Sequence, residues 1–275
     1  MSLGLTTRLA QAVSRTVEAL APVPGAAGAA QACRALAARG EAATLSYFPA
    51  WNGVADGIIE ACGKLSAEMR GQAPGTCLSI KASPLYFDKD NLRAVAGPAS
   101  EAGMTVVFDA LTHLQAEQTL ELAEWLAGEF PSVGVVLPAR WRRSADDARH
   151  LRDTALRIRL VKGEWADPGG GVSGIEAGYL ELVRILAGRQ APVGVATHHP
   201  PLAAQALPVL RDGGTPCELE QLRGLPGRRT RAIARGLGVP VRVYLPFGPG
   251  WWPYAAEKLL ERPYLPWWWL KDRLG

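Results

Sequence analysis

Short apolar runs alternate with helical patterns along most of the chain. The runs that we interpret as buried strands span residues 44–48, 77–82, 105–109, 133–138, 155–162, 192–197, 216–220 and 241–245. Patterns of helical period follow at residues 54–70, 90–102, 115–128, 145–154, 175–188, 201–211 and 229–237, and a last helix begins near Pro253. This regular alternation predicts an α/β protein, a parallel (β/α)8 TIM barrel.

Polar side chains stand at the ends of these apolar runs. Residues 156–165 place Arg159 and Lys162 at the tail of a strand, where a buried charge is costly unless it has a partner. The active sites of (β/α)8 barrels lie at the carboxyl ends of the strands. We therefore expect a ligand site among the polar residues at or beside the strand ends, which are Lys81, Asp109, Arg159, Lys162, His198, Glu220 and Tyr244.

The chain before the first strand has a helical pattern. Residues 5–20 are amphipathic, residues 21–30 are rich in Pro, Gly and Ala and predict a hinge, and residues 31–39 predict a second helix. The arginines of the first segment also fit a transit peptide, but an ordinary helix packed on the barrel is favoured. We expect residues 1–41 to pack on a barrel domain of residues 42–275, which ends in an aromatic tail.

Composition narrows the class of protein. With 48% apolar and 20% charged residues in 275, the chain can bury a large core, and we predict one folded domain around the barrel. The net charge of +4 is mild, and Arg228, Arg229 and Arg231 are interpreted as a solvated helix start, so no nucleic-acid partner is expected. The four cysteines are scattered, which favours a reducing cytoplasmic location, and no apolar run is long enough to span a membrane.

The strand-end residues leave several kinds of chemistry open. Lys81 can form a Schiff base, hold a phosphate or pair with Asp109, and a plain ion pair without chemistry is the alternative. His198 and His199 lack further ligands at metal spacing, so a hydrogen bond to a cofactor is favoured and no metal site is expected. The glycines of residues 167–174 allow a phosphate to approach the main chain, although a flexible loop is favoured.

Six segments that follow one another along the chain carry a family resemblance. Residues 159–163 read Arg-Leu-Val-Lys-Gly, and the supporting segments are residues 80–83, 108–110, 196–198, 218–225 and 241–248. Across residues 42–262 the chain resembles the proline dehydrogenase family of flavoenzymes, of the PutA type. The resemblance implies a distorted (β/α)8 barrel that binds FAD noncovalently, with the flavin ring over the strand ends and the substrate between that ring and the last helix.

The same resemblance implies roles for individual residues. It assigns cofactor binding to Asp109, Arg159, Lys162, Gly163, Thr197, His198 and Glu261. It assigns substrate binding to Lys81, Leu222, Tyr244, Tyr254, Glu257 and Lys258, with Arg159, Lys81 and Tyr244 as the catalytic residues. The implied reaction is hydride transfer from proline, or from a closely related cyclic amino acid, to flavin N5, which produces a cyclic imine.

The last helix departs from the family pattern. Members carry an arginine pair, flanked by a tyrosine and a glutamate, that clamps the substrate carboxylate. Tyr254 and Glu261 keep their places here, but the pair is replaced by Glu257 and Lys258. An anion and a point cation cannot reproduce the bidentate geometry of arginine, and we expect Glu257 to repel a carboxylate.

Other functions therefore stay open beside the leading one. The substrate can be a cyclic amine that lacks the carboxylate or bears a second cation, or the barrel can have lost catalysis and serve as a binding protein. Strand-end Lys81 and Lys162 also permit a lysine-dependent aldolase, but no phosphate-loop signature accompanies them.

The tail combines aromatic and basic residues. Trp251, Trp252, Trp267, Trp268 and Trp269 lie among lysines and arginines, as at a lipid interface, which suggests peripheral contact with the inner membrane near a quinone acceptor. A cover over the barrel mouth explains the same residues and is favoured.

Overall fold

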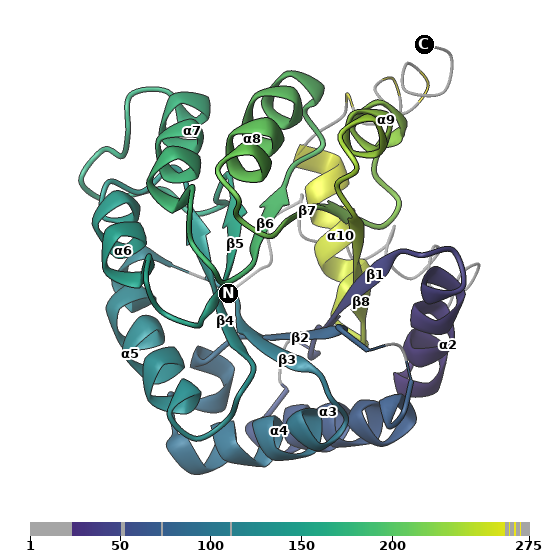
Figure 1. Cartoon of the computed structure of the whole chain (residues 1–275). Helices are drawn as coiled ribbons and strands as arrows, with labels where there is room; N and C mark the ends of the chain where they lie inside the picture. Colours follow the sequence, from purple (N-terminus) through teal and green to yellow (C-terminus); the bar gives the residue numbers. More distant parts are fainter. Residues whose placement is uncertain are drawn as a thin grey trace.

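Eight parallel strands close into a barrel in chain order (Figure 1). This computed structural model describes residues 24–50, 53–72, 74–110, 112–261, 264, 267 and 270. The strands are β1 (Ala42–Tyr47), β2 (Cys77–Ile80), β3 (Thr105–Phe108), β4 (Val133–Pro138), β5 (Arg157–Val161), β6 (Val193–Ala196), β7 (Cys217–Leu222) and β8 (Val241–Phe247). The predicted (β/α)8 barrel is confirmed.

Helices between the strands form the outer layer. They are α3 (Ala55–Met69), α4 (Lys89–Glu101), α5 (Ala116–Ala127), α6 (Ser144–Leu151), α7 (Ile175–Leu186), α8 (Pro200–Asp212) and α9 (Arg228–Gly236), with the short 3₁₀ helices η1 (Ser83–Leu85) and η2 (His113–Gln115). Among the described helices, none is both long and apolar enough to cross a membrane.

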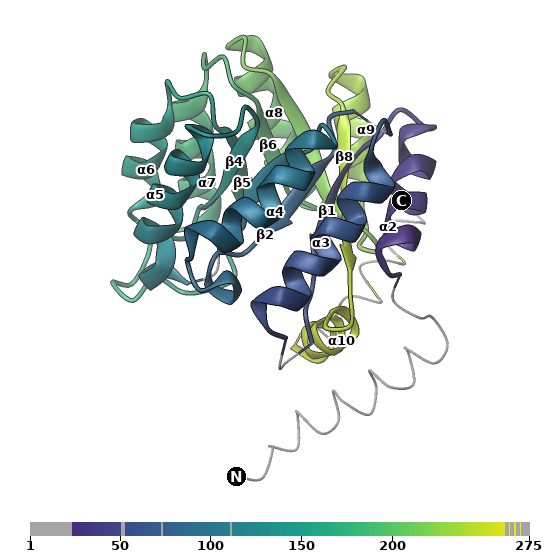
Figure 2. The same ribbon diagram turned by 90° about the horizontal axis from the view of Figure 1, so that it is seen from below.

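Two further helices complete the barrel in different places. Helix α2 (Ala26–Ala37) packs against β1, β8 and α3, and so covers the outer wall where the last strand meets the first. Helix α10 (Trp251–Glu261) follows β8 and lies at the carboxyl end of that strand (Figure 2). Because α2 covers this wall, α10 can lie beside the strand ends, where a (β/α)8 barrel carries its site.

The structure corrects the predicted element boundaries. The predicted hinge at residues 21–30 is wrong from Ala26 onward, because α2 starts there and alanine has the highest helix propensity. The helix predicted at residues 5–20 lies outside the described residues. Strand β2 ends before Lys81, whereas β7 continues two residues beyond Glu220, so Glu220 belongs to the barrel wall and Lys81 to the loop after it.

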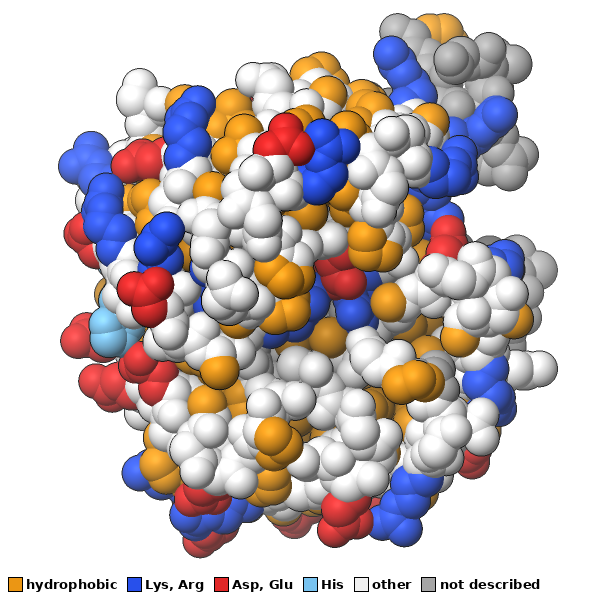
Figure 3. Space-filling view, viewed as in Figure 1, with side chains coloured by type: hydrophobic (Ala, Val, Ile, Leu, Met, Phe, Trp, Pro, Cys, Tyr) orange, Lys and Arg blue, Asp and Glu red, His pale blue; other side chains and the backbone are white. Residues whose placement is uncertain are grey.

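The barrel interior contains charges as well as apolar side chains. At the amino end of the strands, buried Glu218 of β7 contacts both Arg157 of β5 and Arg242 of β8. Arg242 also donates from Nη1 to the carbonyl oxygen of Ala43 at 2.6 Å. A Cβ atom at Gly194 of β6 would lie 3.0 Å from Nη2 of Arg157, so this glycine makes room for the cluster. Figure 3 shows acidic and basic side chains in a hollow at the centre of this view.

Candidate functional site

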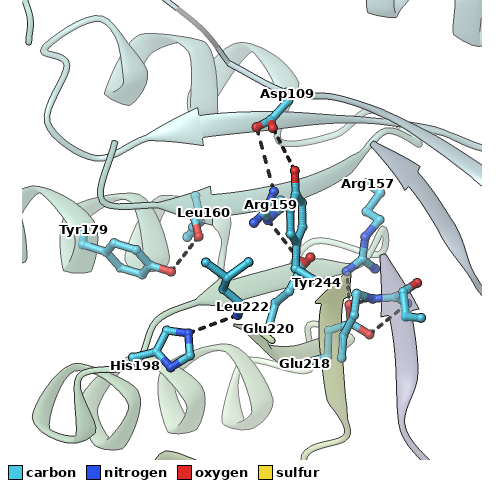
Figure 4. Close-up of polar contacts among 12 residues, drawn as sticks. Asp109, Arg157, Arg159, Leu160, Tyr179, His198, Glu218, Glu220, Leu222 and Tyr244 are labelled. Carbon is cyan, nitrogen blue, oxygen red and sulfur yellow. Dashed lines mark hydrogen bonds and ion pairs between the residues drawn. The ribbon is translucent and has the colours of Figure 1, made fainter. Parts of the chain in front are cut away.

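Five side chains form a polar cluster at the carboxyl ends of β2, β3, β5, β7 and β8. Lys81 follows β2, and Figure 4 shows the others, Asp109, Arg159, Glu220 and Tyr244. Asp109 Oδ2 lies 3.3 Å from Lys81 Nζ and accepts a hydrogen bond from the Tyr244 hydroxyl at 3.3 Å. Arg159 Nε lies 3.2 Å from Glu220 Oε2, and its Nη1 lies 3.9 Å from Asp109 Oδ1. The guanidinium carbon of Arg159 also stacks 4.5 Å from the centroid of the Tyr244 ring. The expected strand-end cluster is therefore present at these positions.

Opposite charges decide the protonation states in this cluster. Burial works against the charged form of Lys81, but the Asp109 carboxylate outweighs it, and the pKa of Lys81 lies above its ordinary value. Burial likewise opposes the charge of Arg159, and Glu220 followed by Asp109 outweighs burial, so the pKa of Arg159 is raised. Burial, reinforced by Asp109, raises the pKa of Tyr244. At neutral pH both cations are charged, and Tyr244 keeps the proton that it donates to Asp109.

The loop after β5 carries the next predicted residues. Lys162 leaves the strand and pairs with Glu176 of α7, with Nζ 3.5 Å from Oε1, while Arg159 stays inside the barrel. Gly163 has a φ of +90°, and a Cβ atom there would lie 2.8 Å from Cβ of Pro138. Only glycine fits this turn, because the backbone angle and the neighbouring strand both exclude a side chain.

The loop after β6 is fixed by hydrogen bonds within the protein. His198 Nδ1 contacts the carbonyl oxygen of Pro226 at 2.6 Å, and the main-chain N–H of Leu222 donates to His198 Nε2 at 3.0 Å. Because a carbonyl only accepts and an N–H only donates, His198 carries its proton on Nδ1. Both ring nitrogens of His198 thus bond to the main chain of the loop after β7 and of Leu222, and the predicted role of His198 in cofactor binding stays a prediction. The buried Thr197 accepts from the His199 N–H at 3.0 Å.

Helix α10 reaches the loop after β5 through a carboxylate that sequence reasoning did not include. Glu164 Oε1 lies 2.6 Å from Lys258 Nζ, and the Tyr254 hydroxyl donates to Glu164 Oε2 at 3.0 Å. Tyr254 is partly buried, and burial followed by the Glu164 charge raises its pKa above the ordinary value, so it remains a donor. The predicted residues Tyr254 and Lys258 thus lie together, and the carboxylate that joins them is that of Glu164.

An aromatic wall connects α10 with the polar cluster. Phe48 follows β1, and its ring centroid lies 5.4 Å from that of Trp251 and 5.3 Å from that of Tyr254. Lys81 Nζ lies 4.9 Å from the centroid of the same Phe48 ring. Phe48, which the sequence analysis placed only at a strand end, therefore joins the last helix to the strand-end cluster.

Two further residues of α10, Glu257 and Glu261, were predicted to bind substrate or cofactor. Glu257 is exposed on α10. Glu261 ends the helix, and its side chain lies outside the part of the chain that the structure describes, as do Trp268 and Trp269 of the tail. Trp251, in contrast, packs on Phe48 and Tyr254 at the strand ends.

The strand-end cluster fits a cofactor that gains negative charge when it is reduced. The Arg159 side chain is only 13% exposed, and its Nε has no aligned hydrogen-bond acceptor among the described residues. A fixed, largely buried cation stabilises negative charge that develops next to it. The turn at Gly163 also leaves main chain without a side chain beside Lys162.

Comparisons with known proteins assign this barrel to a family. No protein-family model matches the chain. Proline dehydrogenase 1 of Bacillus subtilis is 27% identical over 242 residues, which cover 82% of this chain and 79% of that protein. Proline dehydrogenase of Deinococcus radiodurans is 30% identical over 206 residues, which cover 68% of this chain and 66% of that protein.

Solved structures agree with this fold. The structure of proline utilization A (PutA) from Bdellovibrio bacteriovorus inactivated by N-propargylglycine matches with a TM-score of 0.72 at 19% identity, over 86% of this chain and 32% of that one. PutA from Corynebacterium freiburgense matches with a TM-score of 0.69 at 20% identity, over 97% of this chain and 32% of that one. This chain spans about a third of the length of those two proteins.

The fold is a (β/α)8 barrel with a polar site at its strand ends, and the relatives of the chain indicate an oxidoreductase. The chain belongs to the proline dehydrogenase family.

Proposed function

We propose that the protein is an FAD-dependent dehydrogenase that oxidises proline, or a closely related cyclic amine, to the cyclic imine by hydride transfer to flavin N5. The observation that carries this proposal is the position of Arg159. It is a buried cation at the carboxyl end of β5, between Asp109 and Glu220, within the Arg-Leu-Val-Lys-Gly segment that resembles the family motif. Membership of the proline dehydrogenase family supports the same reaction.

Several residues of the chain are suited to hold the cofactor. Arg159 would lie next to the ring position that accepts the hydride, and its charge would stabilise the reduced state. Lys162 and the open main chain at Gly163 would contact the dinucleotide, with Thr197 and Asp109 beside them. When bound, FAD supplies the two-electron acceptor that no amino-acid side chain provides.

The remaining mouth residues are suited to hold a small ring. Lys81, Tyr244 and Leu222 would line the substrate pocket between the strand ends and the aromatic wall of Phe48. The phenol of Tyr244 stays protonated and keeps Asp109 in place, which fixes the direction of the Lys81 ammonium group. Their task would be orientation of the carbon beside the ring nitrogen rather than proton transfer.

The electron acceptor and the role of the Trp-rich tail are the last parts of the proposal. A quinone acceptor and contact of the tail with a membrane remain predictions. The packing of Trp251 on Phe48 and Tyr254 supports a cover over the strand ends, at least for the first tryptophan of the tail.

Cofactor release and anaerobic bleaching test the proposal. Heat-denatured protein should release a flavin that chromatographs as FAD, and the intact yellow protein should bleach when a cyclic secondary amine is added without oxygen. Reduction by dithionite is the control that the bound flavin can be reduced at all. A colourless protein that takes up no added FAD, or a flavin that bleaches with dithionite and with no cyclic amine, would contradict the proposal.

A further inference from the structure

Glu164 lies in the loop after β5, and its carboxylate contacts two polar side chains of α10. It follows Gly163, and its main-chain carbonyl accepts a hydrogen bond from Arg140 Nη1 at 2.6 Å, which fixes this part of the loop. Each carboxylate oxygen has a separate partner on α10, Lys258 at 2.6 Å and Tyr254 at 3.0 Å. One carboxylate thus contacts two polar side chains of this helix at the same time.

The other cations at the carboxyl ends of the strands also pair with carboxylates of the protein. Within the part of the chain that the structure describes, Lys81 contacts Asp109, Arg159 contacts Glu220 and Asp109, and Lys162 contacts Glu176. A carboxylate that arrives with a substrate would have to displace one of these anions or share its cation. Both choices are unfavourable, because like charges repel and a displaced carboxylate must find a new partner.

Burial makes the Glu164 contact harder to displace than an ordinary surface pair. The side chain of Lys258 is 20% exposed and that of Glu164 is 35% exposed, whereas the surface pair of Arg70 and Glu101 has exposures of 61% and 65%. Charge-assisted hydrogen bonds are shorter and stronger than neutral ones, and water and salt screen a partly buried pair less than an exposed one. The contact also includes the Tyr254 hydroxyl, which would lose its acceptor if Glu164 moved away.

We propose that Glu164 is a specificity-determining residue that directs the site to cyclic secondary amines without a carboxylate. This inference rests on the proposed function and specifies its substrate class. Glu164 acts as an internal carboxylate that neutralises Lys258, and the substrate then presents a neutral group, or no group, to α10. The matched pair of compounds that isolates this property is L-prolinamide and L-proline, which share a ring and differ in the charge of one substituent.

The test is the rate of anaerobic flavin reduction with L-prolinamide, pyrrolidine and L-proline in wild type and in Glu164→Gln. Wild type should reduce at lower concentrations of L-prolinamide and pyrrolidine than of L-proline. Glu164→Gln keeps the shape of the side chain and frees the charge of Lys258, so it should shift the preference toward L-proline by roughly ten- to a hundredfold. Combining it with Lys258→Met should abolish that gain, because the carboxylate then has no cation to bind.

Glu101→Gln is the matched control, since it removes one carboxylate from an ion pair at the end of α4, next to the amino end of β3. It should leave the preference unchanged, and the FAD content of each variant shows that the site is intact. A wild type that prefers L-proline, together with an unchanged preference in Glu164→Gln, would overturn the inference while the proposed function stands. A flavin that bleaches with dithionite and with none of the three amines would instead overturn the proposed function.

Discussion

At the scale of single residues, charges at the strand ends are held by opposite charges. Arg159 and Glu220 have side chains that are 13% and 1% exposed, and the Glu220 carboxylate has no aligned hydrogen bond among the described residues. Removing one member of such a pair leaves an uncompensated buried charge, which costs more than the pair contributes. A test of the role of Arg159 must therefore separate its effect on the reaction from its effect on folding.

Arg159→Ala should slow flavin reduction by roughly a hundredfold, or about 3 kcal/mol, and weaken substrate binding much less. The reason is that the arginine charge matters most when the reduced flavin forms. Stopped-flow reduction measured over a range of substrate concentrations gives the rate and the affinity separately. If the rate stays within about threefold of wild type, Arg159 has a structural role only.

The paired variant Arg159→Met with Glu220→Gln supplies the folding control. It removes both buried charges together, so its free energy of unfolding should fall less than that of Arg159→Ala. Its flavin reduction should nevertheless be as slow. Recovery of the rate in the double variant would mean that the single variant was slow because it was misfolded.

The local motifs predicted the cluster better than they predicted its long-range contacts. Arg159, Lys162 and Gly163 are contiguous in sequence, so their spacing alone identifies them. Tyr254 and Glu164 are separated by 90 positions and meet only because α10 lies at the strand ends. The hint that sequence offers is charge: Glu164 stands beside the motif and Lys258 stands where an arginine is expected.

At the scale of elements, the apolar pattern predicted the strands well, but it did not predict where α2 begins or where α10 lies. Buried strands such as β4 are apolar along their whole length, which periodicity detects directly. The start of α2 was missed because Pro24 and Gly25 precede it and its first residues are small, as in a loop. The position of α10 depends on α2 covering β1 and β8, which is a tertiary relation without a local pattern.

Gly163→Ala should disturb the loop after β5 and lower the affinity for FAD. It combines a backbone angle unsuited to alanine with a contact of 2.8 Å to Cβ of Pro138, so the loop that carries Lys162 and Glu164 must move. Gly40→Ala is the control, because Gly40 has a similar positive φ of +73° and no atom within 4 Å of an added Cβ. Both should lose roughly 1–2 kcal/mol of stability, while FAD titration should show weaker binding for Gly163→Ala only. Equal FAD affinity in the two variants would contradict this role of the loop.

At the scale of the whole molecule, the barrel interior holds two charged groups at opposite ends of the same strands. Arg157 and Arg159 lie on β5, Glu218 and Glu220 on β7, each pair separated by one residue that points the other way. The group at the carboxyl end belongs to the candidate site. The group around Glu218 joins β5, β7 and β8 at the amino end, where barrels depend on residues for stability rather than catalysis.

Glu218→Gln should lower the free energy of unfolding at neutral pH by about 3–5 kcal/mol, because Arg157 and Arg242 lose their shared buried anion. Burial would raise the pKa of Glu218, but the two arginines outweigh it and hold that pKa below its ordinary value of 4.5. A depressed carboxylate pKa stabilises the folded state above the ordinary pKa, and this contribution is lost as the pH falls through the folded value. The stability gap between wild type and Glu218→Gln should therefore be widest at neutral pH and narrow below pH 4.5. Urea unfolding across this range measures the gap, with Glu101→Gln as the exposed-pair control, for which a change of about 0–1 kcal/mol is expected. A gap that is small at neutral pH, or that stays constant as the pH falls, would mean that the Glu218 cluster does not hold the barrel closed.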